Sequence, residues 1–109
     1  EDIRIAQCLA SLGSVLKNQS KYLEALEYLS KAANILSRTG EMPNVLAVCL
    51  AEIGDCYKVR GALDQAEALY EKSHEIKVEI YGSEHPEVAA IMKSLGDIAF
   101  DKKNYIHQG

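Results

Sequence analysis

The sequence contains no tryptophan, a single phenylalanine and only two prolines among its 109 residues. So few prolines leave long stretches free to form helices, and the abundant Ala, Leu, Glu and Lys favour helix. No apolar run approaches the roughly 18 residues that a membrane-spanning helix needs. Clusters of Lys and Arg are also missing, and the formal net charge is −4. We therefore expect neither nucleic acid nor a membrane as a partner.

Residues that could carry out catalysis or bind a metal are few and dispersed. The three histidines, His74, His85 and His107, lack the four-residue spacing of a helical metal site. No Ser-His-Asp, Cys-His or paired-carboxylate arrangement is evident, and no Gly-rich phosphate loop is present. The sequence therefore predicts a protein that is not an enzyme and that has no cofactor and no metal.

The three cysteines lack the close C-x-x-C spacing of a metal site. Cys8, Cys49 and Cys56 all lie within apolar helical patterns. We interpret them as small buried hydrophobic residues in a reducing compartment, which indicates a cytoplasmic protein. All three thiols are expected to react slowly until the protein unfolds.

Three glycines recur at nearly equal intervals. Gly13, Gly54 and Gly96 each follow Leu or Ile, and the intervals between them are 41 and 42 residues. Each glycine lies within a helical pattern, where it costs about 1 kcal/mol relative to Ala. Ala25 and Ala66 lie twelve residues after the first two glycines. The residues that keep this register, and form a repeat signature, are Leu12, Gly13, Ala25, Ile53, Gly54, Ala66, Leu95 and Gly96.

The repeat predicts an all-α fold, an α-α superhelix (solenoid) of antiparallel helical hairpins with about two and a half repeats. We expect a single domain over residues 1–109, with repeat units at about 3–43, 44–86 and 87–109. The expected helices span residues 3–17, 21–37, 44–59, 63–81 and 87–102. A turn at residues 102–104 then starts a last helix. The small residues of each hairpin should let its two helices approach closely, with Gly54 against Ala66.

On these residues the chain resembles the tetratricopeptide repeat family over essentially its whole length. The usual repeat of this family has about 34 residues, whereas the intervals here are longer. The longer interval and the segment GSEHPEVA before the third unit resemble the kinesin light chain subtype. The resemblance implies a non-catalytic protein–protein interaction scaffold, which binds a peptide or partner helix in a concave groove lined by the first helix of each unit.

An alternative interpretation gives the chain no ligand groove of its own. In that case it is a structural or self-associating segment of a longer repeat array, because a solenoid usually needs three repeats and polar caps. Exposed repeat ends could then form a homo-oligomer. The sequence opens on Glu1 rather than Met, so a fragment of a longer protein is also expected under this interpretation.

By the family register, the groove comprises one side of each first helix. The candidates are Gln7, Ala10, Ser11, Ser14, Lys17 and Asn18, then Val48, Ala51, Glu52, Asp55, Lys58 and Val59, and then Ala90, Lys93, Ser94, Asp97, Phe100 and Asp101. Those expected to contact a ligand are Ser14, Lys17, Glu52, Asp55, Lys58, Lys93, Asp97, Phe100 and Asp101. The alternative is that these residues form an ordinary solvated face.

The groove candidates do not match two ligand classes of the family. Ala10 and Ser14 stand where chaperone-binding members carry the Lys and Asn that hold a C-terminal carboxylate. The mixture of four acids and three lysines also differs from the basic groove of kinesin light chains. Phe100 replaces the lysines found at its position in the earlier units, and it either anchors a ligand side chain or packs beneath the end of the array.

Overall fold

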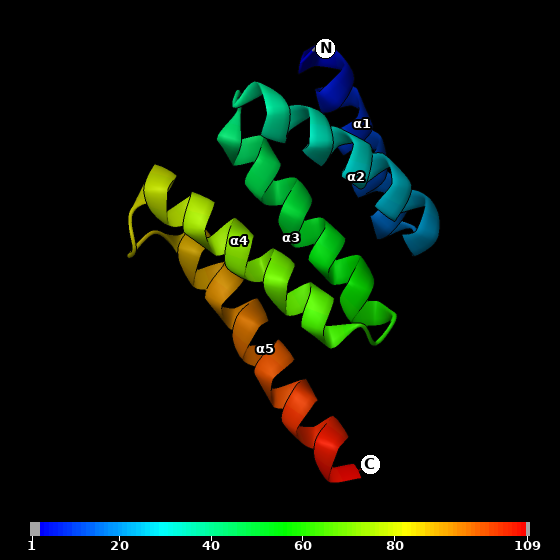
Figure 1. The fold of residues 1–109 in the computed structure, drawn as a ribbon, viewed down its shortest axis with the longest axis vertical. Helices are drawn as coiled ribbons and strands as arrows, with labels where there is room; N and C mark the ends of the chain where they lie inside the picture. Colours follow the sequence, from blue (N-terminus) through cyan, green and yellow to red (C-terminus); the bar gives the residue numbers. More distant parts are fainter. Residues whose placement is uncertain (1–2, 109) are drawn as a thin grey trace.

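The computed structural model describes residues 3–108, and the side chains of residues 3–104. This range contains five helices and no strand (Figure 1), and the helices are α1 (Ile3–Asn18), α2 (Tyr22–Thr39), α3 (Pro43–Val59), α4 (Leu63–Tyr81) and α5 (Pro86–Gln108). Helices α1 and α2 form one hairpin and α3 and α4 a second, while α3 packs on α2 and α5 packs on α4. The predicted all-α solenoid is confirmed. None of the described helices is long and apolar enough to cross a membrane.

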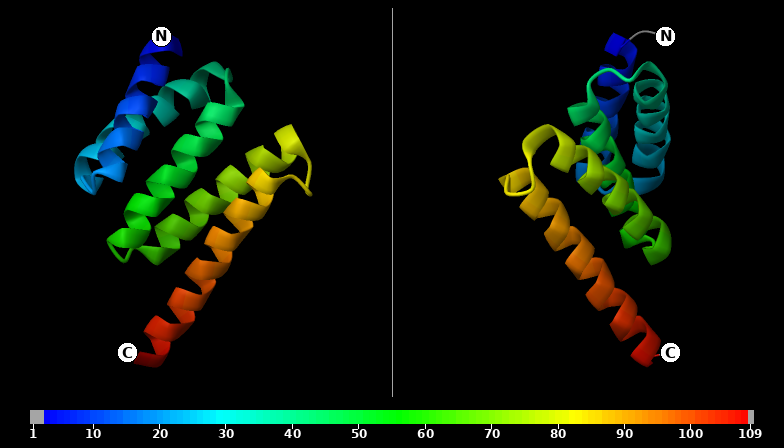
Figure 2. Two further views of the ribbon diagram at one scale, coloured as in Figure 1. Left: turned by 180° about the vertical axis from the view of Figure 1, so that it is seen from behind. Right: turned by 60° about the vertical axis from the view of Figure 1, so that its left-hand side comes forward.

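The helices lie in two layers. Figure 2 shows α1, α3 and α5 side by side in one layer, with α2 and α4 in the other. Helix α1 contacts α3 directly as well as its hairpin partner α2. The layer of α1, α3 and α5 is the one that carries the predicted groove residues.

Each link between the hairpins contains a glycine with a positive φ angle and a proline that begins the next helix. Gly40 and Gly82 follow the ends of α2 and α4 with φ angles of 72° and 86°, values that Gly adopts without steric cost. Pro43 and Pro86 are the first residues of α3 and α5, where the missing N–H is not needed for a helical hydrogen bond.

His85 stabilises the second link between the hairpins through a hydrogen bond and a ring contact. Its Nδ1 accepts a hydrogen bond from the backbone N–H of Glu87 at 3.1 Å, so it satisfies a donor that the start of α5 leaves free. Its ring stacks on Tyr81, with 4.4 Å between the ring centroids. His85 therefore has a structural role at the start of α5.

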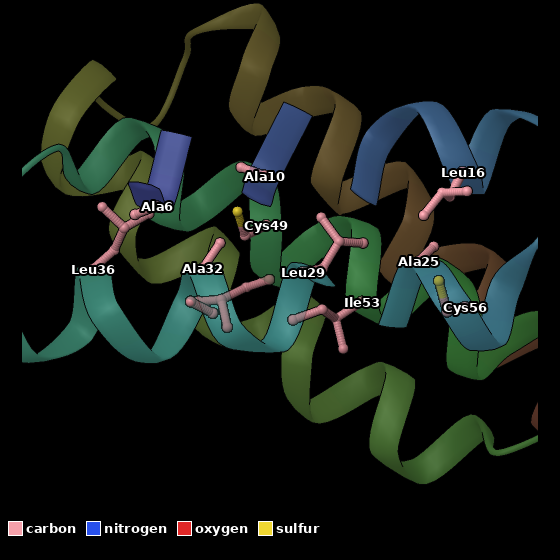
Figure 3. Packing of buried hydrophobic residues seen from close by; sticks show 12 residues of the cluster. Ala6, Ala10, Leu16, Ala25, Leu29, Ala32, Leu36, Cys49, Ile53 and Cys56 are labelled. Atoms are coloured by element: carbon pink, nitrogen blue, oxygen red, sulfur yellow. The ribbon is translucent and has the colours of Figure 1, made fainter. Parts of the chain in front are cut away.

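The main hydrophobic core lies between α1, α2 and α3 (Figure 3). Leu29 and Leu36 of α2 are fully buried there, among alanines that let the helices pack closely. A smaller cluster between α4 and α5 contains Tyr70, Ile91 and Ile98. The third unit is thus held by less apolar surface than the first two.

Gly13 and Gly54 mark close helix contacts, but the nearest side chains are not those of the predicted alanines. A Cβ atom at Gly13 would lie 2.6 Å from Cγ of Leu29, and one at Gly54 would lie 2.9 Å from Cε1 of Tyr70. Ala66 is buried, but it is Tyr70, one turn later, that covers Gly54. Helical side chains lean toward the N-terminus of their helix, so a large residue one turn after the alanine reaches back over the glycine.

Gly96 has no such cover. Nothing lies within 4 Å of the position that its Cβ would occupy, and the residue is exposed. Within the described residues, no second helix of a hairpin packs against this side of α5. The close-packing explanation therefore applies to two of the three repeated glycines.

The predicted turn at residues 102–104 is wrong, because α5 continues as a helix to Gln108. The two hairpin turns that do form place Ser20 and Gly61 at positive φ angles of 65° and 83°. Lys103 stands at the equivalent position, and a long side chain rarely adopts this conformation. Lys103 is therefore less suited to this turn position than Ser20 or Gly61.

Two lysines join α4 to α5. Lys102 forms ion pairs with Asp64 at 2.9 Å and with Glu67 at 3.2 Å, both on α4. These hydrogen bonds raise the pKa of Lys102. Lys77 of α4 is buried, and its amino group lies 3.7 Å from Glu87 of α5. These three ion pairs hold α5 against α4.

The predicted burial of all three cysteines is wrong for Cys8, which is exposed, while Cys49 and Cys56 are buried. Cys49 holds the same register position in α3 as Cys8 does in α1, and it belongs to the core formed with the first hairpin. Leu12 and Ile53 also share a register position and differ in the same way, since Leu12 is 43% exposed and Ile53 only 5%. Burial at these positions depends on a preceding hairpin, and none precedes α1 among the described residues.

Candidate binding groove

Polar side chains of α1 and α3 pair with one another across the layer. Ser14 Oγ donates a hydrogen bond to Glu52 Oε1 at 2.6 Å. Lys17 Nζ donates to Asp55 Oδ2 at 2.9 Å and lies 3.5 Å from Glu52 Oε2. The hydroxyl of Tyr70 on α4 donates to the other carboxylate oxygen of Asp55. Four of the side chains thus come from the predicted groove, and they form one network.

The network changes the ionisation of its members. Burial alone would lower the pKa of Lys17, but the hydrogen bond and charge of Asp55, together with Glu52, raise it. Burial, followed by the hydrogen bond to Asp55, raises the pKa of Tyr70. Lys17 therefore stays charged and Tyr70 stays neutral throughout the physiological range. The two carboxylates share one lysine, so the network keeps a net negative charge.

All three helices of this layer contribute to one hollow. It has a volume of about 530 Å³ and lies where α1 and α3 end. Its lining residues are Lys17, Asn18, Ser20, Tyr22, Asp55, Lys58, Val59 and Asp101. Asp101 comes from α5, so this hollow spans the three units.

A second hollow lies toward the other end of α1, with a volume of about 230 Å³. It is lined by Ala10, Ser11, Ser14, Asn44, Val45, Val48, Cys49, Glu52 and Tyr81. A third, of about 470 Å³, lies between the α1–α2 turn and Arg60. We give the third hollow no role in the groove, because it contains none of the groove candidates.

The remaining groove candidates of α5 are accessible to a ligand. Lys93 and Asp97 are exposed, Phe100 is 64% exposed and Asp101 is half-buried. Asp97 is close enough to Tyr70 that its charge contributes to raising the tyrosine pKa. In the part of the chain whose side chains are described, neither Lys93 nor the half-buried Lys58 forms an ion pair. These groups keep their charges available.

The other predicted positions divide by exposure. Gln7, Ser11, Asn18, Val48, Val59 and Ala90 are exposed, whereas Ala51 and Ser94 are half-buried and Ala10 is buried. Ser94 donates its hydroxyl hydrogen bond to the backbone oxygen of Ala90 at 3.4 Å. The face therefore offers apolar as well as charged side chains.

Sequence reasoning missed Tyr70 as a member of the network. It aligns with the buried Leu29, and a hydroxyl at such a position needs a hydrogen-bond partner. Ser73, which aligns with the buried Ala32, has one too, because its hydroxyl donates to the backbone oxygen of Ala47 at 2.7 Å. The sequence did contain a signal for these hydrogen bonds. It was a polar residue at a register position that holds an apolar residue in the other unit.

The described residues contain no group of three His, Cys, Asp or Glu side chains that could hold a metal ion. His74 is half-buried on α4, and the side chain of His107 lies outside the described residues. Burial, followed by the charge of Glu52, raises the pKa of Cys49 to about 11, and burial also raises the pKa of Cys56. Both buried thiols are thus poor nucleophiles.

Comparison with known families gives two matches. One tetratricopeptide repeat family model matches residues 5–40, and another matches residues 46–106. The first match covers the α1–α2 hairpin, and the second extends from α3 into α5. No curated protein sequence matches the chain.

Proposed function

The chain belongs to the tetratricopeptide repeat family, whose repeats generally mediate protein–protein interactions, and we propose that it is a non-catalytic scaffold that binds a peptide or a partner helix. The binding surface is the concave groove lined by α1, α3 and α5. The observation that carries this proposal is the hollow that Lys17, Asp55 and Asp101 share, because these residues come from three successive units. A single extended or helical segment could contact all three helices there.

The charge of the groove favours a basic ligand. Glu52 and Asp55 already share Lys17, so their charges are partly neutralised within the protein. Asp97 and Asp101 form no ion pair among the residues with described side chains, and they would meet Lys or Arg residues of the ligand. Such pairs contribute mainly to association rate and specificity, and they weaken with salt.

Phe100 is the proposed apolar anchor of the groove. It is 64% exposed and lies between Asp97 and Asp101 in the sequence. Large apolar side chains that become buried at the centre of an interface usually carry most of the affinity. A ligand with one large apolar side chain flanked by basic residues would fit this arrangement.

The test uses two sets of synthetic peptides of equal length, one with a central Leu flanked by lysines and one with the same Leu flanked by glutamates. Fluorescence anisotropy should show tighter binding of the lysine peptides, and higher salt should weaken it. Phe100→Ala should weaken binding about tenfold or more, as expected for an anchor worth over 1.4 kcal/mol. Asp97→Lys should weaken the lysine peptides and improve the glutamate peptides.

Asp97 is preferred to Asp55 for this charge reversal, because Asp55 holds Lys17 and Tyr70 in place and its loss would also disturb the fold. Leu23→Lys is the matched control, since Leu23 is 67% exposed on α2, which belongs to the other layer. Equal binding of both peptide sets, or binding unaffected by Phe100→Ala and Asp97→Lys alike, would contradict groove binding.

The alternative remains a structural or self-associating segment of a longer repeat array without a ligand groove of its own. The observation in its favour is the set of exposed apolar residues on the two end helices, such as Leu12 and Met92. Molecular mass measured against concentration distinguishes the two functions, because groove binding does not require self-association.

We also propose the finer assignments that the sequence indicates. The 41- and 42-residue intervals support the long-repeat subtype that resembles kinesin light chains. The hairpins α1–α2 and α3–α4 support a single domain over residues 1–109, with units at about 3–43, 44–86 and 87–109. The free cysteines support a cytoplasmic location.

A further inference from the structure

Lys17 and Lys58 hold the same register position, each a turn after the glycine of its unit, but they differ in their partners. Lys17 of α1 reaches across to α3, where its Nζ lies 2.9 Å from Asp55 Oδ2 and 3.5 Å from Glu52 Oε2. Lys58 of α3 is half-buried and forms no ion pair with any described side chain. The lysine of the second unit therefore retains a charge that is neutralised in the first.

The repeat identifies the acid that would complete a second pair of this kind. Asp55 and Asp97 each directly follow the glycine of their unit. Asp97 of α5 is therefore, for Lys58, the counterpart of the aspartate that binds Lys17. Asp97 is exposed, and it too forms no ion pair with a described side chain. An ion pair thus links α1 to α3, whereas the corresponding groups of α3 and α5 remain separate.

Two features distinguish the junction of α3 and α5 from that of α1 and α3. Helix α1 contacts α3 directly, whereas α3 and α5 approach each other less closely, and α5 packs on α4 instead. In addition, Glu52, which contributes to holding Lys17, has Ser94 as its counterpart in α5. The hydroxyl of Ser94 donates to the backbone oxygen of Ala90. The junction of α3 and α5 is therefore more open and has one carboxylate fewer.

The unpaired charges border the hollow of about 530 Å³. Lys58 lines it from α3, and Asp101, one turn after Asp97, lines it from α5. The other two charged residues of its lining, Lys17 and Asp55, already pair with each other. A ligand in this hollow therefore meets a cation on α3 and carboxylates on α5. A uniformly basic ligand would place like charge against Lys58, and such contacts oppose binding.

We propose that the groove ligand carries an acidic side chain that pairs with Lys58 and a basic side chain that pairs with Asp97. The ligand would then link α3 to α5 as the intramolecular ion pair links α1 to α3. This inference rests on the proposed function, and it narrows the ligand from a basic segment to one that carries both charges. Lys58 is then a specificity-determining residue of the groove. Because Lys58 is half-buried, its pair is less screened than a pair of fully exposed groups.

Three short peptides of equal length test the proposal, each with a central Leu between two variable positions. The mixed peptide carries Lys and Glu at these positions, the second carries Lys and Gln, and the third carries Gln and Glu. Each is made in both orders, and the tighter order is compared. In fluorescence anisotropy at low salt, the mixed peptide should bind about fivefold tighter than either of the others, the upper end of what a partly exposed ion pair contributes. Higher salt should reduce both preferences.

Single variants assign each preference to its residue. Lys58→Met removes the charge and keeps an unbranched apolar side chain, so it should abolish the preference for Glu over Gln and leave the preference for Lys. Asp97→Asn should reduce the preference for Lys over Gln and leave the preference for Glu. Lys72→Met is the matched control, because Lys72 is an exposed lysine on α4, in the other layer. It changes the net charge as Lys58→Met does, and it should retain both preferences.

The same substitution at the two register positions tests the protein without a ligand. Lys17→Met removes a formed ion pair and leaves its two carboxylates without their lysine, so the midpoint of urea unfolding should fall. Lys58→Met removes no ion pair among the described side chains, so its midpoint should not fall. A fall for Lys58→Met that disappears in the Asp97→Asn background would show that the two residues pair directly. That result would overturn the proposal.

The remaining outcomes separate this inference from the groove proposal itself. If the peptide with Lys and Gln binds at least as tightly as the mixed peptide, the ligand needs no acid and the inference is wrong, while groove binding stands. A preference for Glu that persists in Lys58→Met would also overturn the inference. So would its loss in Lys72→Met, which would reflect net charge alone. Binding of none of the peptides would contradict groove binding, and the inference would fail with it.

Discussion

Gly54 and Gly96 occupy the same position in their repeat units but have different surroundings. Substitutions at the two sites should therefore change the free energy of unfolding in opposite directions. Gly96→Ala should stabilise the protein by about 0.5–1 kcal/mol, because the new Cβ meets nothing and a helical Gly is costly. Gly54→Leu should destabilise it by about 1–3 kcal/mol, since the side chain would overlap the ring of Tyr70. Urea unfolding measures both, at protein concentrations low enough to prevent association.

Gly54→Ala tests the reason for this difference. Its single methyl group would lie 2.9 Å from the ring of Tyr70, and the hydroxyl of that ring is held by Asp55. The ring can move only if that hydrogen bond is disturbed, so Gly54→Ala should gain less stability than Gly96→Ala. Equal gains for the two alanine variants would show that the ring moves freely and that Gly54 is not needed for packing.

The thiols should react at two distinct rates. Cys8 is exposed and should be labelled quickly in the folded protein. Cys49 is buried and its pKa is raised from 9.0 to about 11, which reduces its thiolate fraction roughly 100-fold near neutral pH. Cys56 is buried as well, with a raised pKa. A thiol reagent should therefore label one site per folded chain, and all three in urea.

Cys8→Ser is the control for this prediction, because the rapid phase should then disappear while the slow phases remain. Rapid labelling in Cys8→Ser would mean that Cys49 or Cys56 becomes accessible through local opening of the helices.

Tyr70 and Lys17, which form contacts between helices, should make the protein less stable at alkaline pH. Both groups have a pKa in the folded protein above their ordinary values of 10.0 and 10.5. Their contribution is therefore fully present below pH 10 and is lost as the pH rises through the folded pKa values. The buried thiols Cys49 and Cys56, whose pKa values are raised above 9.0, add to this loss. The free energy of unfolding should therefore begin to fall at about pH 9, and it should fall further above pH 10, the ordinary value for the tyrosine.

Tyr70→Phe separates the tyrosine from the lysine in this pH dependence. It should reduce the fall above pH 10, and it should cost about 1 kcal/mol at neutral pH through the lost hydrogen bond. Tyr57→Phe is the matched control, since Tyr57 is half-buried and its hydroxyl forms no hydrogen bond with a described side chain. An identical alkaline fall in all three proteins would remove Tyr70 from the explanation.

The sequence predicts elements well where local signals and the repeat agree. Helix α4 has the predicted bounds, Leu63–Tyr81, because Gly61 ends the helix before it and Gly82 follows it. The prediction was wrong at residues 102–104, where the repeat register suggested a turn and α5 continues as a helix. Lys103 stands where the two formed turns place Ser20 and Gly61 at positive φ angles, and a long side chain rarely adopts that conformation.

Across the whole molecule, the family register assigned one side of α1 and of α3 to a common groove, but it could not predict the pairs that form between their side chains. The link from Lys17 to Asp55 depends on how far one hairpin is rotated on the next. Burial of Cys49 and exposure of Cys8 likewise depend on neighbouring hairpins. Such contacts between units are set by the stacking geometry, which the spacing of residues along one helix does not contain.

Stability should also be uneven across the molecule. The main core joins α1, α2 and α3, whereas α5 is held mainly by the smaller cluster with α4. In stacked repeats, each unit is stabilised by its neighbours, so a weakly covered end can open separately. Hydrogen exchange in dilute protein should therefore be faster for the backbone amides of α5 than for those of α2 and α3.

Two alanine variants distinguish local opening of α5 from unfolding of the whole chain. Ile98 and Leu29 are both fully buried, and replacing either by Ala removes contacts worth about 2–5 kcal/mol. Ile98→Ala should speed exchange in α5 and leave the amides of α2 close to their wild-type rates. Leu29→Ala should speed exchange throughout α1, α2 and α3, because it lies at the centre of the main core. If Ile98→Ala instead lowered protection equally in all five helices, the chain would unfold as one unit, and the small α4–α5 cluster would be as essential to the fold as the large one.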